Sequence, residues 1–337
     1  MADVLLETKL HIPPLHRNLV RRPRLIQRLN EGLAPDRRMM LISAPAGYGK
    51  STLLSEWVSQ VRLPAAWLSL GAEENTPVRF WSYFISALSN LPALHQAACC
   101  DSLLVSLQSP QPPPMAAVLT DLMNGLSAVE GEMVLVLDDL HSITDKQIHQ
   151  DLVFLISHLP HSGIRLHLVA ASRMDPPWPL ARWRGKGELT ELRASDLRFS
   201  LAEVAQFLDQ VFQLKLFPQD ITALQEQIEG WIVGLQMAAV SMQGKWKAQG
   251  AHGVSSFITT LSGSNRFILD YLMDEVISQQ PGEIRDFLQA TSLLEQFTAP
   301  LCDALLSRQD SQAILDSIEQ ANLFLLPLDE KRKWYRY

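Results

Sequence analysis

The feature that most restricts the fold is a glycine-bearing loop near the N-terminus, placed between an apolar run and an amphipathic stretch. Residues 44–52 read Ala-Pro-Ala-Gly-Tyr-Gly-Lys-Ser-Thr and follow the apolar run Met39–Ile42. A strand, a loop with glycines and a helix that opens with Lys-Ser-Thr are typical of a phosphate-binding loop, or P-loop. The first position of the usual pattern is glycine, whereas this chain has Ala44. The strand and the helix expected on either side supply the context that the motif requires.

Each part of this loop has a physical role toward phosphate. Successive backbone N–H groups and a helix N-terminus attract an anion, and Gly47 and Gly49 let the backbone curl closely around it. The Lys50 ammonium would reach the β- and γ-phosphates, and the Ser51 hydroxyl would ligate Mg²⁺. The sequence therefore predicts that the chain binds a nucleoside triphosphate.

Composition places the chain among ordinary globular proteins. It has 337 residues, enough for two or three domains, and 47% of them are apolar. The formal net charge of −7 argues against nonspecific nucleic-acid binding by the chain as a whole.

The same survey gives an expected compartment. Three cysteines, two of them adjacent, form neither a disulfide framework nor a zinc pattern. Residues 1–14 contain two acidic residues and lack the long apolar run of a signal peptide. No run approaches the ~20 apolar residues that span a bilayer. We therefore expect a cytoplasmic protein without a membrane partner.

Short apolar runs alternate with helical patterns in the first two thirds of the chain. This alternation predicts βαβ units and an α/β fold with a five-stranded parallel sheet. The strands are expected at 39–43, 65–70, 133–138, 166–172 and 188–192, and the intervening helices at 51–60, 78–91, 115–129 and 146–158. Proline-rich 109–114 reads as a surface loop.

After about Leu197 the strand signals stop and helical patterns follow. Ser200 and Glu203 have the spacing of a capping box at the first of these helices. A cluster of Gly, Ser and His around 247–256 indicates a weak break. The helices are expected at 201–212, 218–229, 234–243, 264–278, 283–290 and 311–320. Residues 324–328 and 333–337 predict a hairpin, and a chain that ends in its second strand is expected to be part of a longer protein.

A second buried strand ends in two carboxylates. Residues 134–137 are apolar, and Asp138 and Asp139 follow them. Beside the P-loop, Asp138 would hold Mg²⁺, because hard cations prefer oxygen ligands. Asp139, one residue farther on, would polarise the attacking water as a general base. The alternative is an Asp-Asp turn that simply ends a strand.

Arg173, His141 and two tryptophans each have a functional and a purely structural interpretation. Arg173 follows the strand at 166–172 and would contact the γ-phosphate, or it is a solvated loop arginine. His141 would orient water or tie down the loop, and we favour the loop role. Trp67 and Trp81 are expected in the core or an interface rather than against adenine.

Six segments of the chain match the pattern of one family: 19–25, 43–52, 77–81, 137–141, 230–236 and 299–305. Together they resemble the MalT-like branch of signal-transduction ATPases, which are LuxR-type transcriptional activators. The resemblance covers essentially the whole chain, and the Arg-Pro-Arg-Leu before the P-loop and the Gly-Trp segment make it specific.

The resemblance implies an ATP- and ADP-dependent switch that self-associates when ATP is bound, with slow Mg²⁺-dependent hydrolysis. It implies a P-loop nucleotide-binding domain at 1–197, a helical arm at 198–262 and an incomplete winged-helix domain at 263–337. Asp138, Asp139 and Arg173 would form the catalytic set, and Ser51 and Asp138 would hold the metal. The implied nucleotide-binding residues are Val20, Arg22, Ala44, Pro45, Ala46, Gly47, Tyr48, Gly49, Lys50, Ser51 and Thr52.

The chain departs from the family pattern in two ways. The Gly-x-Pro that many wider relatives carry reads Gly234-Leu235-Gln236, which makes a direct nucleotide contact there doubtful. A winged-helix histidine that contacts ADP in the family would fall just past Tyr337. The regions expected to bind a small-molecule inducer and DNA are also outside this chain, so it should not bind DNA by itself.

A P-loop turnover enzyme, such as a kinase or a motor-type ATPase, is the alternative function. A kinase would need an acceptor site and an arginine-rich lid, and a motor would need fast hydrolysis and an arginine supplied in trans. A scaffold with a degenerate nucleotide site is disfavoured because Lys50, Ser51 and Asp138 are all present.

Overall fold

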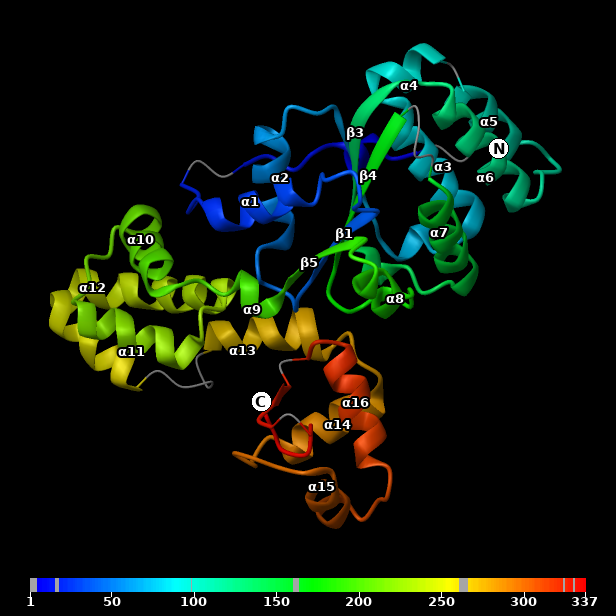
Figure 1. Ribbon diagram of the computed structural model, residues 1–337. Helices are drawn as coiled ribbons and strands as arrows, with labels where there is room; N and C mark the ends of the chain where they lie inside the picture. Colours follow the sequence, from blue (N-terminus) through cyan, green and yellow to red (C-terminus); the bar gives the residue numbers. More distant parts are fainter. Residues whose placement is uncertain are drawn as a thin grey trace. The chain divides into compact units, whose positions relative to one another are not determined.

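The computed structural model describes residues 5–15, 18–97, 99–159, 164–260, 266–323, 325–329 and 331–337. They form two compact units (Figure 1). The first contains the described residues of 1–16, 21–43 and 50–196, and the second those of 17–20, 44–49 and 197–337. The three-domain division at 1–197, 198–262 and 263–337 stays a prediction.

A five-stranded parallel sheet forms the centre of the first unit, which confirms the α/β prediction (Figure 1). Its strands are β1 (Met39–Ser43), β2 (Ala65–Ser69), β3 (Gly131–Asp138), β4 (Ile164–Ser172) and β5 (Leu189–Arg193), in the order β2-β3-β4-β1-β5. All five residues of β1 are buried, as expected of a strand covered on both faces.

The strand order brings three functional strand ends together. β4 lies between β1 and β3, and its register pairs Ser172 with Ser43 and Ala170 with Leu137. Because the strands are parallel, the carboxyl ends of β1, β3 and β4 meet at one edge of the sheet.

Helices cover both faces of this sheet. Figure 1 shows α1 and α2 on one side of it and α3, α5, α6 and α7 on the other. The helices of this part of the chain are α1 (Pro23–Glu31), α2 (Lys50–Gln60), α3 (Pro77–Ser89), α4 (Pro92–Ala97), α5 (Cys99–Leu107), α6 (Met115–Ser127), α7 (Lys146–His158), α8 (Leu180–Gly185) and α9 (Ala194–Leu197), with 3₁₀ turns at Glu7–Leu10, Ala72–Glu74 and Leu140–Ser142.

The sequence predicted the long helices of this unit but none of those with nine residues or fewer, such as α1, α4, α5 and α8. A helix this short has only two or three apolar positions on its buried face, as α1 has Leu25, Ile26 and Leu29, and this signal is weaker than that of the longer helices. Trp67 and Trp81 are fully buried, which confirms their expected place in the core. Trp81 packs edge-on against Phe80, with ring centroids 5.2 Å apart.

The second unit begins with three helices, α10 (Leu201–Phe212), α11 (Pro218–Ile228) and α12 (Ile232–Thr260). The predicted capping box is confirmed: the Ser200 hydroxyl accepts from Glu203 N, and the Glu203 carboxylate accepts from Ser200 N. The predicted break around 247–256 is wrong, because α12 continues through it. Val254 and Ile258 are buried in the cluster that these helices share, so packing outweighs the weak helix propensity of Gly and Ser.

The rest of the second unit is a set of shorter helices followed by a hairpin. The helices are α13 (Arg266–Leu272), a π-helical turn (Met273–Ile277), α14 (Gly282–Thr291), α15 (Ala299–Leu306) and α16 (Ser311–Gln320). β6 (Leu326–Pro327) and β7 (Tyr335–Arg336) pair antiparallel, as the hairpin prediction requires. Of the predicted helices and strands, residues 264, 265 and 324 lie outside the described residues. Within the described residues, no helix is both long and apolar enough to cross a bilayer.

Candidate nucleotide-binding site

The predicted P-loop connects β1 to α2. Gly47 and Gly49 have φ angles of 79° and 74°, in the left-handed region that glycine adopts without steric cost. α2 begins at Lys50, directly after the second glycine. The other predicted loop residues are largely buried, with Ala44 fully buried and Ala46 and Tyr48 each 6% exposed. The local backbone is therefore the curled loop and helix start that an anion cradle requires.

Lys50 is a buried cation at the start of α2. Its side chain is buried, and burial lowers its pKa to about 8. Asp139 and Asp138 raise this pKa, whereas Arg173 lowers it, so all three charges lie near the Lys50 amine. The structure thus brings together four residues that the sequence placed in one site.

Asp138, the last residue of β3, is a buried carboxylate whose charge acts on Lys50. It is 4% exposed, and burial, with a smaller contribution from Asp139, raises its pKa to about 6. A hydrogen bond with the Ser51 side chain opposes this shift. The two oxygen groups predicted to hold Mg²⁺ are therefore in direct contact. Thr52, the next residue of α2, is half-buried.

Asp139 begins the turn after β3 in an unusual conformation. Its φ and ψ are 55° and 39°, a left-handed geometry that aspartate tolerates better than most residues. Its side chain is 46% exposed, so it differs sharply from its buried neighbour Asp138. The predicted role of Asp139 as a general base stays a prediction.

His141 lies close to this acidic turn. Its Nδ1 is 3.8 Å from Asp139 Oδ1 and, within the part of the chain that the structure describes, is buried without a hydrogen-bond partner. Burial, followed by the charges of Arg173 and Lys50, lowers the pKa of His141 to about 3. The imidazole is therefore neutral at physiological pH, and its two proposed roles stay open.

Arg173 follows β4 at the same sheet edge. β4 is hydrogen-bonded to both β1 and β3, which explains why the Arg173 charge acts on Lys50 and on His141. This position is compatible with a contact to a bound phosphate. The γ-phosphate contact itself stays a prediction.

Val20 and Arg22, the residues predicted to line the adenine or ribose, are both buried. Val20 belongs to the second unit, where it packs in the cluster that includes Phe199 and Leu235. Arg22 belongs to the first unit and precedes the first residue of α1. Their contacts to nucleotide stay predictions.

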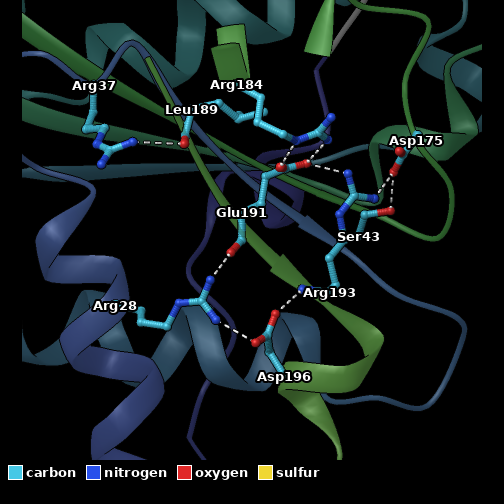
Figure 2. A network of polar contacts seen from close by, with 9 residues as sticks. All are labelled: Arg28, Arg37, Ser43, Asp175, Arg184, Leu189, Glu191, Arg193 and Asp196. Carbon is cyan, nitrogen blue, oxygen red and sulfur yellow. Dashed lines mark hydrogen bonds and ion pairs between the residues drawn. The ribbon is translucent and has the colours of Figure 1, made fainter. Parts of the chain in front are cut away.

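A network of charged and polar residues at this edge was not predicted from the sequence (Figure 2). Arg193 in β5 bonds to both Asp175 and Glu191, and the Ser43 hydroxyl donates to Asp175 Oδ1 at 2.7 Å. Arg184 completes a two-bond pair with Glu191 at 2.7 and 2.8 Å. This network ties the residue before the P-loop to the segment after β4.

The same network reaches α1. Arg28 donates to the Glu191 carbonyl at 2.7 Å and pairs with Asp196. Burial alone would raise the pKa of Glu191, but hydrogen bonds from Arg184 and Arg193 lower it below its usual value. The alternate charged positions 191 and 193 of β5 are the one signal of this network in the sequence, because they share a strand face.

Comparisons with known proteins agree with this architecture. An AAA ATPase domain family matches residues 18–169, and a MalT winged helix domain family matches residues 273–337. In the solved structures, a Walker-type ATPase of Pyrococcus abyssi aligns over 96% of this chain and 94% of its own, with a TM-score of 0.60 and 16% identity. At that identity the likeness shows the fold alone.

Curated relatives extend the match to nearly the full chain. It is 33% identical over 333 residues to the HTH-type transcriptional regulator MalT of Yersinia enterocolitica, and 32% identical over 335 residues to that of Cronobacter sakazakii. These alignments cover 98% and 99% of this chain but 35% and 36% of the relatives, so it spans about a third of their length. By sequence, the chain is therefore a homologue of the MalT transcriptional regulators, with an AAA ATPase domain of the P-loop type and a MalT winged helix domain.

Proposed function

We propose that this chain is the ATP- and ADP-binding switch module of a MalT-like transcriptional activator. The observation that carries the proposal is the meeting of a buried lysine and a buried aspartate at one sheet edge. Burial disfavours the charged form of both, since the pKa of Lys50 falls to about 8 and that of Asp138 rises to about 6. Perturbed groups of this kind concentrate at functional sites, and a bound polyphosphate with its metal ion would favour both charges.

The donor set fits Mg²⁺. This ion takes one or two carboxylates from a protein and completes its shell with water and phosphate oxygens. Ser51 and Asp138, which are hydrogen-bonded to each other, supply oxygen donors of that kind. When bound, Mg²⁺ would neutralise phosphate charge, while Lys50 binds the β- and γ-phosphates, Asp139 orients and deprotonates water, and Arg173 contacts the γ-phosphate.

In this proposal the ADP-bound chain is in a resting state and the ATP-bound chain self-associates. Slow ATP hydrolysis would set how long the self-associated state lasts. Small-molecule inducer and DNA would bind through parts of the relatives that this chain does not match, and the whole protein would act in the cytoplasm. The support is the sequence likeness to MalT regulators together with the P-loop site.

The first test is nucleotide binding by the purified chain. Mass spectrometry after denaturation would identify any nucleotide that copurifies, and calorimetry would measure the affinities for ADP and ATP with Mg²⁺. We expect retained ADP and binding of both nucleotides. A chain that binds neither would refute the nucleotide site.

The second test separates a switch from a turnover enzyme. Light scattering should show a larger mass with ATP and Mg²⁺ than with ADP, and the hydrolysis rate should stay below ~1 s⁻¹, the low end of typical enzyme rates. Faster steady turnover without any change in mass would favour the P-loop enzyme instead.

A further inference from the structure

Two carbonyl groups of the P-loop accept hydrogen bonds from the start of α12. The Trp231 indole Nε1 donates to the Ala46 carbonyl at 3.0 Å, and Val233 N donates to the Gly47 carbonyl at 3.2 Å. All four residues belong to the second unit. Val233 is the second residue of its helix, so its N–H has no acceptor within the helix and the P-loop supplies one.

These bonds fix the direction of two peptide groups. A trans peptide is planar, and its C=O and N–H point to opposite sides. When the Ala46 and Gly47 carbonyls face α12, the N–H groups of Gly47 and Tyr48 must face away from it. Successive N–H groups on one side of a loop are the donors of an anion-binding nest.

The fit around the two glycines is close. A Cβ on Gly47 would lie 2.8 Å from both Trp231 Nε1 and Val233 Cβ, and one on Gly49 would lie 3.0 Å from Ile232 Cδ1. Gly47 is therefore needed both for its left-handed backbone and for this contact with α12.

The residue between the glycines is held by the same part of the second unit. Tyr48 is buried, and its side chain hydrogen-bonds Arg198, which opposes the rise in the Tyr48 pKa that burial causes. Arg198 in turn pairs with Glu229 at 2.9 Å. Ala46, Gly47 and Gly49 thus lie against residues 231–233 at the start of α12, and Tyr48 contacts Arg198 of the Arg198–Glu229 ion pair.

We propose that Trp231 and Val233 are positioning residues that hold the P-loop with its N–H groups available to a diphosphate or triphosphate. The proposal rests on the nucleotide function above and adds residues that act on the loop from its carbonyl side. By linkage, a bound polyphosphate strengthens the two hydrogen bonds as much as they strengthen its binding.

The test uses Trp231→Phe, which removes the donor and keeps a ring to pack against Tyr271. Calorimetry should show ADP and ATP binding about threefold to tenfold weaker, the range for one net hydrogen bond. AMP, with a single phosphate, should lose less affinity than ADP, and the Gly47 amide resonance should shift in the nucleotide-free variant. The matched control is Trp334→Phe, whose half-exposed indole lies in the hairpin and whose loss should change none of these values.

A second measurement needs no variant. In the unmodified chain, saturation with ADP should slow hydrogen exchange at the Trp231 indole and at the Val233 amide. Unchanged exchange at both groups, or Trp231→Phe binding ADP like the unmodified chain with an unmoved Gly47 resonance, would overturn this inference and leave the nucleotide function standing. If the unmodified chain binds neither nucleotide, the proposed function itself is wrong.

Discussion

Two aspartates, one at the sheet edge of the first unit and one in the loop before α16 of the second, have opposite environments. Asp138 is 4% exposed, and burial raises its pKa to about 6. The Asp310 side chain is 61% exposed and accepts from Arg308 Nε at 2.6 Å and from Nη2 at 2.9 Å. These bonds lower the pKa of Asp310 below its usual value.

The difference separates a binding region from a structural one. At Asp310 the charge is balanced within the chain and by water, so no ligand is needed. Asp138 and Lys50 are buried, and burial disfavours the charged form of both side chains. Such an arrangement costs stability unless a ligand offsets it, and a ligand that binds the folded state alone repays that cost by mass action.

The largest expected effect is the loss of nucleotide binding in Lys50→Ala. The variant should keep the fold, because it removes a buried charge, but bind ADP and ATP about 100-fold more weakly, near the upper end of the range for a charge-assisted hydrogen bond. Calorimetry measures this, with exposed Lys186→Ala as the matched control. Undiminished affinity would remove Lys50 from the site.

Asp139→Asn should keep ATP binding and slow single-turnover hydrolysis by about 100-fold, the lower range for loss of a general base. Rapid-quench measurement with excess protein over ATP isolates this step. Because the Asp139 carboxylate is half-exposed, the change should leave the fold intact, and thermal unfolding of the variant checks that. An unchanged rate would show that another group activates water.

The strands and the site residues at their ends could be predicted because each carries its own signal. Apolar runs of four or five residues, at 39–42, 133–137 and 168–171, come before the P-loop, before Asp138 and, with Ser172 between, before Arg173. The parallel βαβ rule then brings these ends to one edge without further information. This is why Lys50, Asp138 and Arg173 could be assigned to one place before their surroundings were known.

The features that could not be predicted from the sequence depend on contacts between residues that are far apart in the chain. The break predicted near 247–256 rests on local composition, whereas Val254 and Ile258 are buried by packing within their cluster. Arg28 and Asp196 are 168 positions apart, and Trp231 and Ala46 are 185 apart. No periodicity or motif spacing encodes such pairs, so the network of Figure 2 and the P-loop contacts of α12 needed the structure.

The pKa of Lys50 predicts how nucleotide affinity changes with pH. Phosphate binds the charged amine, so below a pKa of about 8 this group adds no pH dependence. At a pH above this pKa, the neutral Lys50 amine of the free protein must take up a proton when nucleotide binds. Nucleotide affinity should therefore fall by up to about tenfold per pH unit. Calorimetry with ADP in EDTA, from about pH 7 to about pH 10, tests this. Lys50→Arg, which stays charged, should bind with a flat profile over the same range.

The smallest effect is expected at the other aspartate. Asp310→Asn removes one of two acidic partners of Arg308 and leaves Glu283, and exposed ion pairs of this kind contribute little to stability. ADP affinity and the thermal midpoint should therefore match those of the unmodified chain, whereas Asp138→Asn should abolish the Mg²⁺ dependence of nucleotide affinity. If Asp310→Asn instead changed the Mg²⁺ dependence of ADP affinity, as is expected of Asp138→Asn, the charge of Asp310 would act on the nucleotide, and burial would not be what distinguishes the two aspartates.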